Sequence, residues 1–170
     1  MLDAVGIAIS PAERAAIEVA DLGLGDPDHY GLQIVIYENN DRYCAKELIL
    51  FPRQICPEHR HPHYVCPGDT VEKPGKQETF RCRWGHVYLY VAGEPTPSPQ
   101  AIIPEGDEAC FTACHEIVLE PGDQYTLSPE TLHWFQAGDE GAIISEFSTT
   151  NTDEYDVFTD PRIKRLPVYE

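Results

Sequence analysis

Beyond residue 30, apolar positions fall in short runs rich in β-branched and aromatic side chains, and Pro and Gly separate these runs at regular intervals. Runs of this length and composition predict β-strands rather than helices. The expected strands span residues 32–38, 42–51, 58–63, 79–84, 86–91, 115–120, 123–127, 132–137 and 142–148. Many short strands in one chain favour two packed antiparallel sheets. The pattern therefore predicts an all-β jelly roll.

The N-terminal segment has a different pattern, which indicates one short helix over residues 10–20. Ser10 suits the N-cap position, and Pro11 suits the first helical position. Glu13 can return a hydrogen bond to the N-cap residue, which would complete a capping box. We therefore expect a single short helix before the strands begin.

The length of 170 residues suits a single domain, with an N-terminal arm at residues 1–30 and a C-terminal arm at residues 149–170. The formal charge of −17 argues against binding to nucleic acid or to an anionic membrane, and a neutral or cationic small molecule is the better partner. The sequence shows no apolar run of the roughly 20 residues that span a bilayer, and no secretory leader. We expect a cytoplasmic protein whose six cysteines are reduced.

Three stretches far apart in the sequence carry residues that suit one metal site. His59 and His61 are separated by one residue, so on an extended segment both imidazoles point to the same face. Glu78 and His133 would add a carboxylate and a third imidazole. Nitrogen and oxygen ligands of this kind suit Mn, Fe, Co, Ni or Zn, and a six-coordinate ion would keep two positions for substrate. These four residues predict a metal centre that takes part in chemistry.

The alternative is that these histidines are ordinary packed or surface residues, because seven histidines in 170 residues can produce one His-x-His pair by chance. His63 has the same strand parity as His59 and His61. It stands at the start of a long loop that contains Pro and Gly, so we expect an exposed or outer-sphere position for it rather than ligation.

The spacing of the candidate ligands resembles the two motifs of the cupin family. Glu78 is followed by six residues and Gly85, and Gly122 precedes His133 by eleven positions. The agreement has departures. Ala137 stands where Asn is usual, and the spacer of 16 residues between the second histidine and Glu78 is longer than the spacer in the simple motif. The resemblance implies the cupin jelly-roll β-barrel, a double-stranded β-helix, with the metal in its interior.

A longer and more literal agreement points to one branch of the cupins. Over roughly residues 30 to 165 the chain resembles the D-lyxose isomerase family, with CPEHRH at 56–61, GKQETFRCRWG at 75–85 and TLHWFQAG at 131–138, and with segments 44–47, 87–91, 145–149 and 158–161. The resemblance implies a Mn²⁺-dependent, commonly dimeric enzyme that interconverts D-lyxose with D-xylulose and D-mannose with D-fructose. Co²⁺, Fe²⁺, Ni²⁺ and Zn²⁺ are alternative ions for these ligands. The expected partners are a monosaccharide and a second copy of the chain.

Four further residues are candidates for moving the proton between C1 and C2. Glu146 lies in an apolar strand, where a buried acid is costly unless it is paired or catalytic, and the resemblance implies an acid/base role for it. Lys76 shares the face of Glu78 if the segment is extended, and Lys46 is a similar candidate in another apolar strand. The resemblance also favours Asp156 as a second acid or base. Their structural alternatives are an outward-facing Glu146, a Lys46 whose ammonium reaches solvent, and a solvated acidic tail around Asp156.

Trp134, Phe135 and Tyr90 are candidates to wall a sugar pocket, although core packing is the commoner explanation for each of them. Two other functions fit the same ligand set: a cupin oxygenase or oxidase, and a sugar-binding cupin without turnover. O2 consumption would identify the first, and tight sugar binding without product would identify the second. Lys76 and Glu146 favour proton transfer over both.

Overall fold

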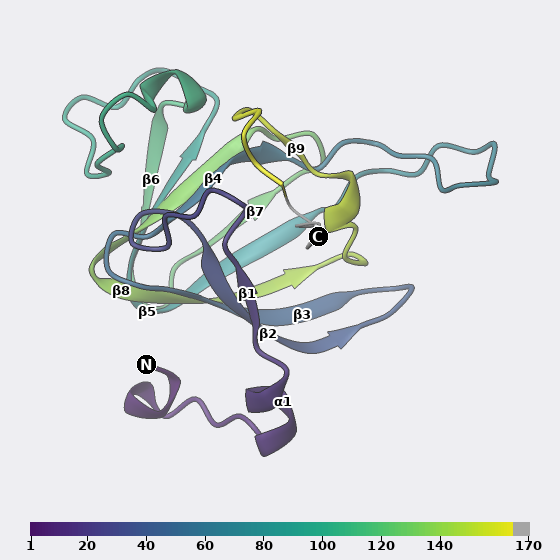
Figure 1. The fold of residues 1–170 in the computed structure, drawn as a ribbon, viewed down its shortest axis with the longest axis horizontal. Coiled ribbons are helices and arrows are strands. Elements are labelled where there is room, and N and C mark those ends of the chain that lie inside the picture. Colours follow the sequence, from purple (N-terminus) through teal and green to yellow (C-terminus); the bar gives the residue numbers. More distant parts are fainter. Residues whose placement is uncertain (165–170) are drawn as a thin grey trace.

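The structure is a computed structural model that describes residues 1–164 (Figure 1). The helical elements are η1 (Leu2–Val5), α1 (Pro11–Ala15), η2 (Glu108–Cys110) and η3 (Asp153–Tyr155), where η denotes a 3₁₀ turn. The strands are β1 (Glu18–Ala20), β2 (Leu32–Asn39), β3 (Cys44–Leu50), β4 (Ile55–Arg60), β5 (Glu78–Val91), β6 (His115–Leu119), β7 (Gln124–Leu127), β8 (His133–Ser148) and β9 (Val157–Phe158). The described chain is mostly β, as the hydrophobic pattern predicts. Within it, no helix has the length and apolar character to cross a membrane.

The sheet curls into a barrel because its two longest strands take part in both layers. β8 pairs with β3 through residues 142–148, with β4 through residues 133–136, and with β5 along most of its length. β6 and β7 pair with opposite halves of β5. Figure 1 shows β5 and β8 turning together at one side of the molecule. This arrangement places the inward faces of both layers around one interior.

Two long strands replace four that the sequence predicts as separate. The predicted strands at 79–84 and 86–91 form β5, and those at 132–137 and 142–148 form β8. Gly85 and Gly141 lie where the strands change layer, and their φ angles are +71° and +96°. A Cβ atom on Gly85 would lie 2.0 Å from the carbonyl oxygen of Gly141. The two glycines therefore bend the strands without ending them, because no side chain obstructs the close approach.

The N-terminal helix begins as predicted but ends earlier. Ser10 and Glu13 form both hydrogen bonds of the capping box, and Ser10 Oγ accepts from the Glu13 N–H at 3.2 Å. The helix ends at Ala15, and the predicted extension to residue 20 is wrong, because Glu18–Ala20 forms β1 and pairs with β2. Ala20 is buried in the barrel core, so tertiary pairing outweighs the local preference of these residues.

The C-terminal arm packs against the barrel. β9, which the hydrophobic pattern does not predict, pairs with β4 and sets Phe158 opposite His59. Residues 149–160, here called the C-terminal strap, therefore run beside the strand that carries the first candidate ligand. Figure 1 shows this segment, which contains β9, toward the yellow end of the colour scale. Residues 165–170 of the predicted arm lie outside the described residues.

Inside the barrel an apolar cluster adjoins buried charged residues. The apolar cluster includes Leu32, Ile34, Leu48, Leu50, Phe80, Leu89, Phe135 and Ile144. The buried charged residues nearby include Lys46, Lys76, Glu78 and Glu146. One cavity is lined by members of both sets. Since buried charges are costly unless they are paired or functional, this cavity is where a functional site is expected.

Candidate metal centre

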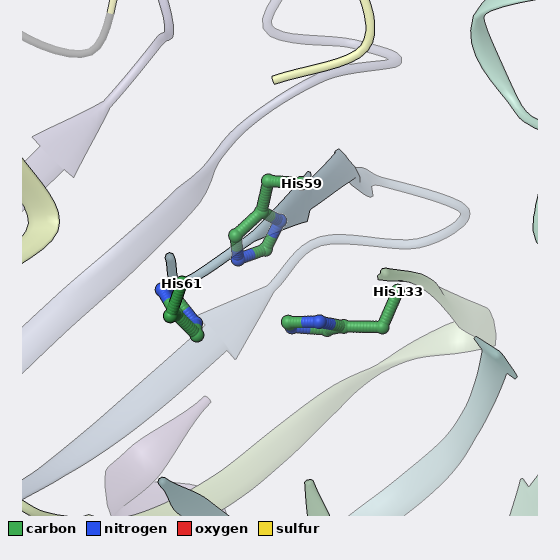
Figure 2. A group of neighbouring side chains, drawn as sticks. All are labelled: His59, His61 and His133. Carbon is green, nitrogen blue, oxygen red and sulfur yellow. The ribbon is translucent and has the colours of Figure 1, made fainter. Parts of the chain in front are cut away.

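Three histidines converge inside the barrel (Figure 2). His59 lies on β4, and His61 follows the end of that strand, which stops at Arg60 rather than at the predicted residue 63. His133 begins β8 and is the register partner of His59. All three are buried, and one nitrogen from each lies within 4.8 Å of the others. Within residues 1–164, no other group of three or more potential ligands gathers in this way.

In each histidine, Nδ1 is hydrogen-bonded to a protein oxygen. His59 Nδ1 donates to the carbonyl oxygen of Pro57 at 2.8 Å, and His133 Nδ1 donates to that of Thr131 at 2.9 Å. His61 Nδ1 donates to a carboxylate of the strap at 2.5 Å. A proton on Nδ1 leaves the lone pair on Nε2, and such outer contacts orient metal-binding histidines. The three rings therefore present Nε2 as the ligating atom.

Glu78, the first residue of β5, adds a carboxylate to the same place. Its Oε1 lies 3.1 Å from His61 Nε2 and 3.0 Å from His133 Nε2. The second approach lacks hydrogen-bond geometry, and His133 Nε2 has no hydrogen-bond partner within the described residues. A buried nitrogen left with a free lone pair beside a carboxylate suits a cation. The structure thus brings the four predicted ligands together.

The electrostatics of the site favour positive charge within it. Burial lowers the pKa of His59 well below its ordinary value, and the neighbouring imidazoles add to this effect, so the ring is neutral and able to ligate. For Glu78, burial is outweighed by Lys76 and His61, which hold its pKa well below the usual range. For His61, burial is outweighed by Glu78 and by two carboxylate hydrogen bonds, which raise the pKa to about 9, so a metal ion that binds Nε2 would have to displace a proton.

A group of buried ion pairs continues from Glu78 toward β3 and β8. Lys76 Nζ lies 3.0 Å from Glu78 Oε2 and 3.3 Å from Glu146 Oε1. Lys46 Nζ lies 3.3 Å from the same oxygen of Glu146. Glu146 is only 2% exposed and Lys46 only 4%, so Glu146 does not face outward from its strand and the Lys46 ammonium does not reach solvent. The predicted acid and both predicted lysines are therefore in mutual contact inside the barrel.

This group contains more negative than positive side chains. Asp153 lies 3.4 Å from Lys76, and Asp156 contacts His61, so the four carboxylates are those of Glu78, Glu146, Asp153 and Asp156. With the carboxylates ionised and His61 neutral, as ligation requires, the two lysines leave two negative charges in a largely buried site. A divalent cation at the three histidines would neutralise them. Both the donor set and the charge therefore fit a divalent metal ion.

The strap supplies site residues that the sequence analysis does not identify. Asp153 contacts the ammonium groups of Lys76 and Lys46, at 3.4 and 3.9 Å. Phe158 stacks on the ring of His59, with the centroids 5.2 Å apart. Both also line the cavity. Several acids occur in this tail without any periodicity, so the sequence carries no signal that marks Asp153 as the one that turns inward.

The cavity is polar on the side of the ion pairs and apolar elsewhere. Its apolar lining includes Ala20, Leu22, Leu32, Ile34, Leu48 and Phe80. Phe135 also lines it, whereas Trp134 and Tyr90 stack on each other, with centroids 4.0 Å apart, in a separate cluster. Successive residues of a strand face opposite sides, so Trp134 cannot share the face of Phe135. Core packing, the commoner explanation for such residues, therefore accounts for Trp134 and Tyr90, and of the three candidates Phe135 lines the cavity.

His63 lies away from the site, as expected. Its side chain is 47% exposed, and its Nδ1 is 3.6 Å from a carboxylate oxygen of Glu72. The six cysteines are free thiols, which agrees with the expected reduced state.

Solved structures resemble this barrel. The L-ribose isomerase of Acinetobacter sp. DL28 in complex with L-ribose superposes with a TM-score of 0.76 at 15% identity, over 95% of this chain and 88% of that one. The L-ribose isomerase of Cellulomonas parahominis with no ligand gives a TM-score of 0.72 at 16% identity, over the same shares of the two chains. At such identities the likeness shows the fold. Fold and site together define a cupin-like β-barrel that encloses three histidines.

Sequence comparison gives the family. A family model described as D-lyxose isomerase matches residues 13–170, and the chain belongs to this family. It is 62% identical over 167 residues to a D-lyxose ketol-isomerase of Thermofilum sp. (strain ex4484_79), covering 98% of this chain and 89% of the relative. It is 61% identical over 169 residues to a D-lyxose/D-mannose isomerase of Thermosediminibacter oceani, covering 99% and 90%. The protein is therefore an enzyme of the aldose–ketose isomerase class.

Proposed function

We propose that this enzyme interconverts D-lyxose with D-xylulose and D-mannose with D-fructose, and that it uses Mn²⁺ or a related divalent ion. The proposed ligands are His59, His61, Glu78 and His133. The observation that carries the proposal is the set of three buried imidazoles beside a carboxylate, in a site short of positive charge. The names of two relatives, D-lyxose ketol-isomerase and D-lyxose/D-mannose isomerase, support the choice of sugars.

The reaction defines what the site must do. An aldose and its ketose differ by two hydrogens moved between C1 and C2, so the enzyme must hold both oxygens and relocate a proton at carbon. A bound divalent ion supplies Lewis-acid polarisation of the sugar oxygens. The chain supplies an acid/base group, fixed positive charge, and a partly enclosed cavity in which these charges act strongly.

Glu146 is the proposed acid/base residue. In the aldose-to-ketose direction its carboxylate removes the proton from C2 and then delivers a proton to C1, while the proton of the C2 hydroxyl passes to the oxygen on C1. Lys46 and Lys76 hold Glu146 Oε1 at 3.3 Å each, which fixes the direction of the carboxylate. Lys76 also reaches Glu78, so its ammonium lies between the ligand set and the base. There it stabilises the negative charge that develops on the sugar oxygens.

Asp156 has a different place from Glu146. Its Oδ1 accepts from His61 Nδ1 at 2.5 Å, so in this proposal it orients a ligand. The acid/base role that the family resemblance favours for Asp156 stays a prediction. Asp153 is proposed to balance the charges of the two lysines, which it contacts.

Because the chain belongs to the isomerase family, isomerisation is preferred over the oxygenase function and over sugar binding without catalysis. The contacts between Glu146 and two lysines support proton transfer in particular. The single-domain organisation of residues 1–170, the homodimer and the cytoplasmic location stay predictions. Light scattering on the purified protein tests the homodimer.

The proposed reaction is tested by incubating metal-loaded protein with D-lyxose and with D-mannose in D2O and following the products by NMR. We expect D-xylulose and D-fructose to appear, with deuterium at C1, because a carboxylate base exchanges its proton with solvent. Protein stripped of metal is the control and should give neither ketose. The absence of both ketoses in the presence of Mn²⁺, Co²⁺ and Fe²⁺ would contradict the proposal.

A further inference from the structure

Another buried carboxylate, that of Glu58, lies beside the site on the outer side of β4. It precedes His59, and because strand residues alternate, its side chain points away from the three histidines. Glu58 is 0% exposed, which is unusual for an acid. It takes no part in the proposed chemistry. Its hydrogen bonds explain why it is tolerated in the interior.

The carboxylate of Glu58 accepts four hydrogen bonds. Oε2 accepts from the backbone N–H groups of Thr112 at 2.7 Å and Ala113 at 2.6 Å. Oε1 accepts from the hydroxyls of Thr112 at 2.9 Å and Thr159 at 2.7 Å. Bonds to a charged acceptor are stronger than neutral ones, so this carboxylate holds two segments that are far apart in sequence.

The first of these segments reaches the third histidine. The carbonyl oxygen of Ala113 accepts from Trp134 Nε1 at 2.9 Å, and Trp134 follows His133 in β8. The loop that Glu58 anchors therefore packs against the residue next to a proposed ligand. This contact lies on the face of β8 opposite the cavity.

The second segment is the strap. Thr159 donates its hydroxyl to Glu58 Oε1 and its backbone N–H to the Glu58 carbonyl oxygen at 3.0 Å. The residue before it, Phe158, stacks on His59, and Asp156 bonds His61. Both strap contacts with the ligands lie within three residues of this attachment point.

We infer that Glu58 is a positioning residue, which ties the strap to β4 and so keeps Asp156 and Phe158 against His61 and His59. The geometry of the attachment stands on the structure alone, whereas its effect on turnover rests on the proposed function. Glu58 itself is not among the residues that line the cavity. Its action is therefore through the strap.

Two threonines allow a matched test, because each gives one hydroxyl to the same oxygen of Glu58. Thr159→Val removes the bond to the strap, and Thr112→Val removes the bond to the other segment. Hydrogen exchange of residues 152–159 is measured by mass spectrometry on the metal-free protein. We expect Thr159→Val to accelerate exchange of the strap about tenfold, the effect of losing one bond to a charged group, while Thr112→Val leaves it unchanged. Thr159→Ser, which keeps the hydroxyl, should behave as the native protein.

The same variants are then loaded with Mn²⁺ and assayed with D-lyxose. Thr159→Val should raise the KM and the Mn²⁺ dissociation constant several-fold, and Thr112→Val should change neither. Equal exchange rates in the two valine variants would overturn the inference, since the carboxylate would then act only through overall stability. If the native protein converts no sugar, the proposed function fails, but the exchange comparison still decides the role of Glu58.

Discussion

Replacing Glu146 with glutamine is expected to abolish conversion of D-lyxose while the protein keeps its metal. Glutamine has nearly the same volume and can still accept from Lys46 and Lys76, so the ion pairs become hydrogen bonds and the barrel stays intact. It cannot accept a proton from carbon. Loss of a general base lowers rates by about 10²–10⁴-fold, and we expect a fall in kcat of at least about 10³-fold. Steady-state kinetics and metal analysis of the same sample measure both quantities.

The control for this variant is Glu47→Gln. Glu47 is also buried in the same sheet, at 4% exposure, but its carboxylate accepts from Ser145 Oγ at 2.7 Å on the outer face. This variant should retain turnover within a few-fold. A Glu146→Gln protein that keeps its activity, or that loses its ion together with its activity, would contradict the assigned role.

His133→Ala is expected to remove the bound ion and the activity together. His133 is completely buried, and its Nε2 is the nitrogen left without a hydrogen-bond partner among residues 1–164. Mutation of groups that only orient ligands weakens metal binding by about 10–100-fold, so loss of a ligand should weaken it by more than about 100-fold. Isothermal titration with Mn²⁺ measures the affinity, and circular dichroism shows whether the barrel remains folded.

His63→Ala provides the comparison, because this side chain is half exposed and outside the cavity. It should bind Mn²⁺ and convert D-lyxose as the native protein does. If His133→Ala bound Mn²⁺ with native affinity, the ion would have to be held elsewhere, and the ligand set proposed here would be incorrect.

Much of the site could be predicted because it depends on local backbone geometry. The His-x-His pair faces one way whether or not the second histidine lies inside the strand, and Lys76 meets Glu78 because two residues of extended chain separate them. Glu146 was recognisable as an acid within an apolar strand. In each case the side chain's direction follows from alternation, which the sequence displays directly.

The features that could not be predicted depend on distant pairing. Glu18–Ala20 forms a strand only because it pairs with the edge strand β2, and β9 forms only because it pairs with β4. Asp153 and Glu58 are two acids among 29 acidic residues, and nothing local distinguishes them. Their importance appears only when the strap is seen against the barrel, since each contacts residues more than 50 positions away.

The net charge of the buried site links the candidate metal ligands to the neighbouring ion pairs. Four carboxylates surround two lysines in the barrel interior, and three imidazoles present Nε2 beside them. Such an arrangement is unfavourable without a cation, because buried charges of one sign are not compensated. In the proposed function, the same excess of negative charge favours a divalent ion at the histidines, with a carboxylate base near it.

A crystal structure of the protein soaked in Mn²⁺, with anomalous scattering collected near the manganese edge, tests the metal centre most directly. We predict one strong anomalous peak per chain, within coordination distance of Nε2 of His59, His61 and His133 and of a carboxylate oxygen of Glu78. A peak at any other place, or histidines that turn Nδ1 toward the ion, would contradict the account.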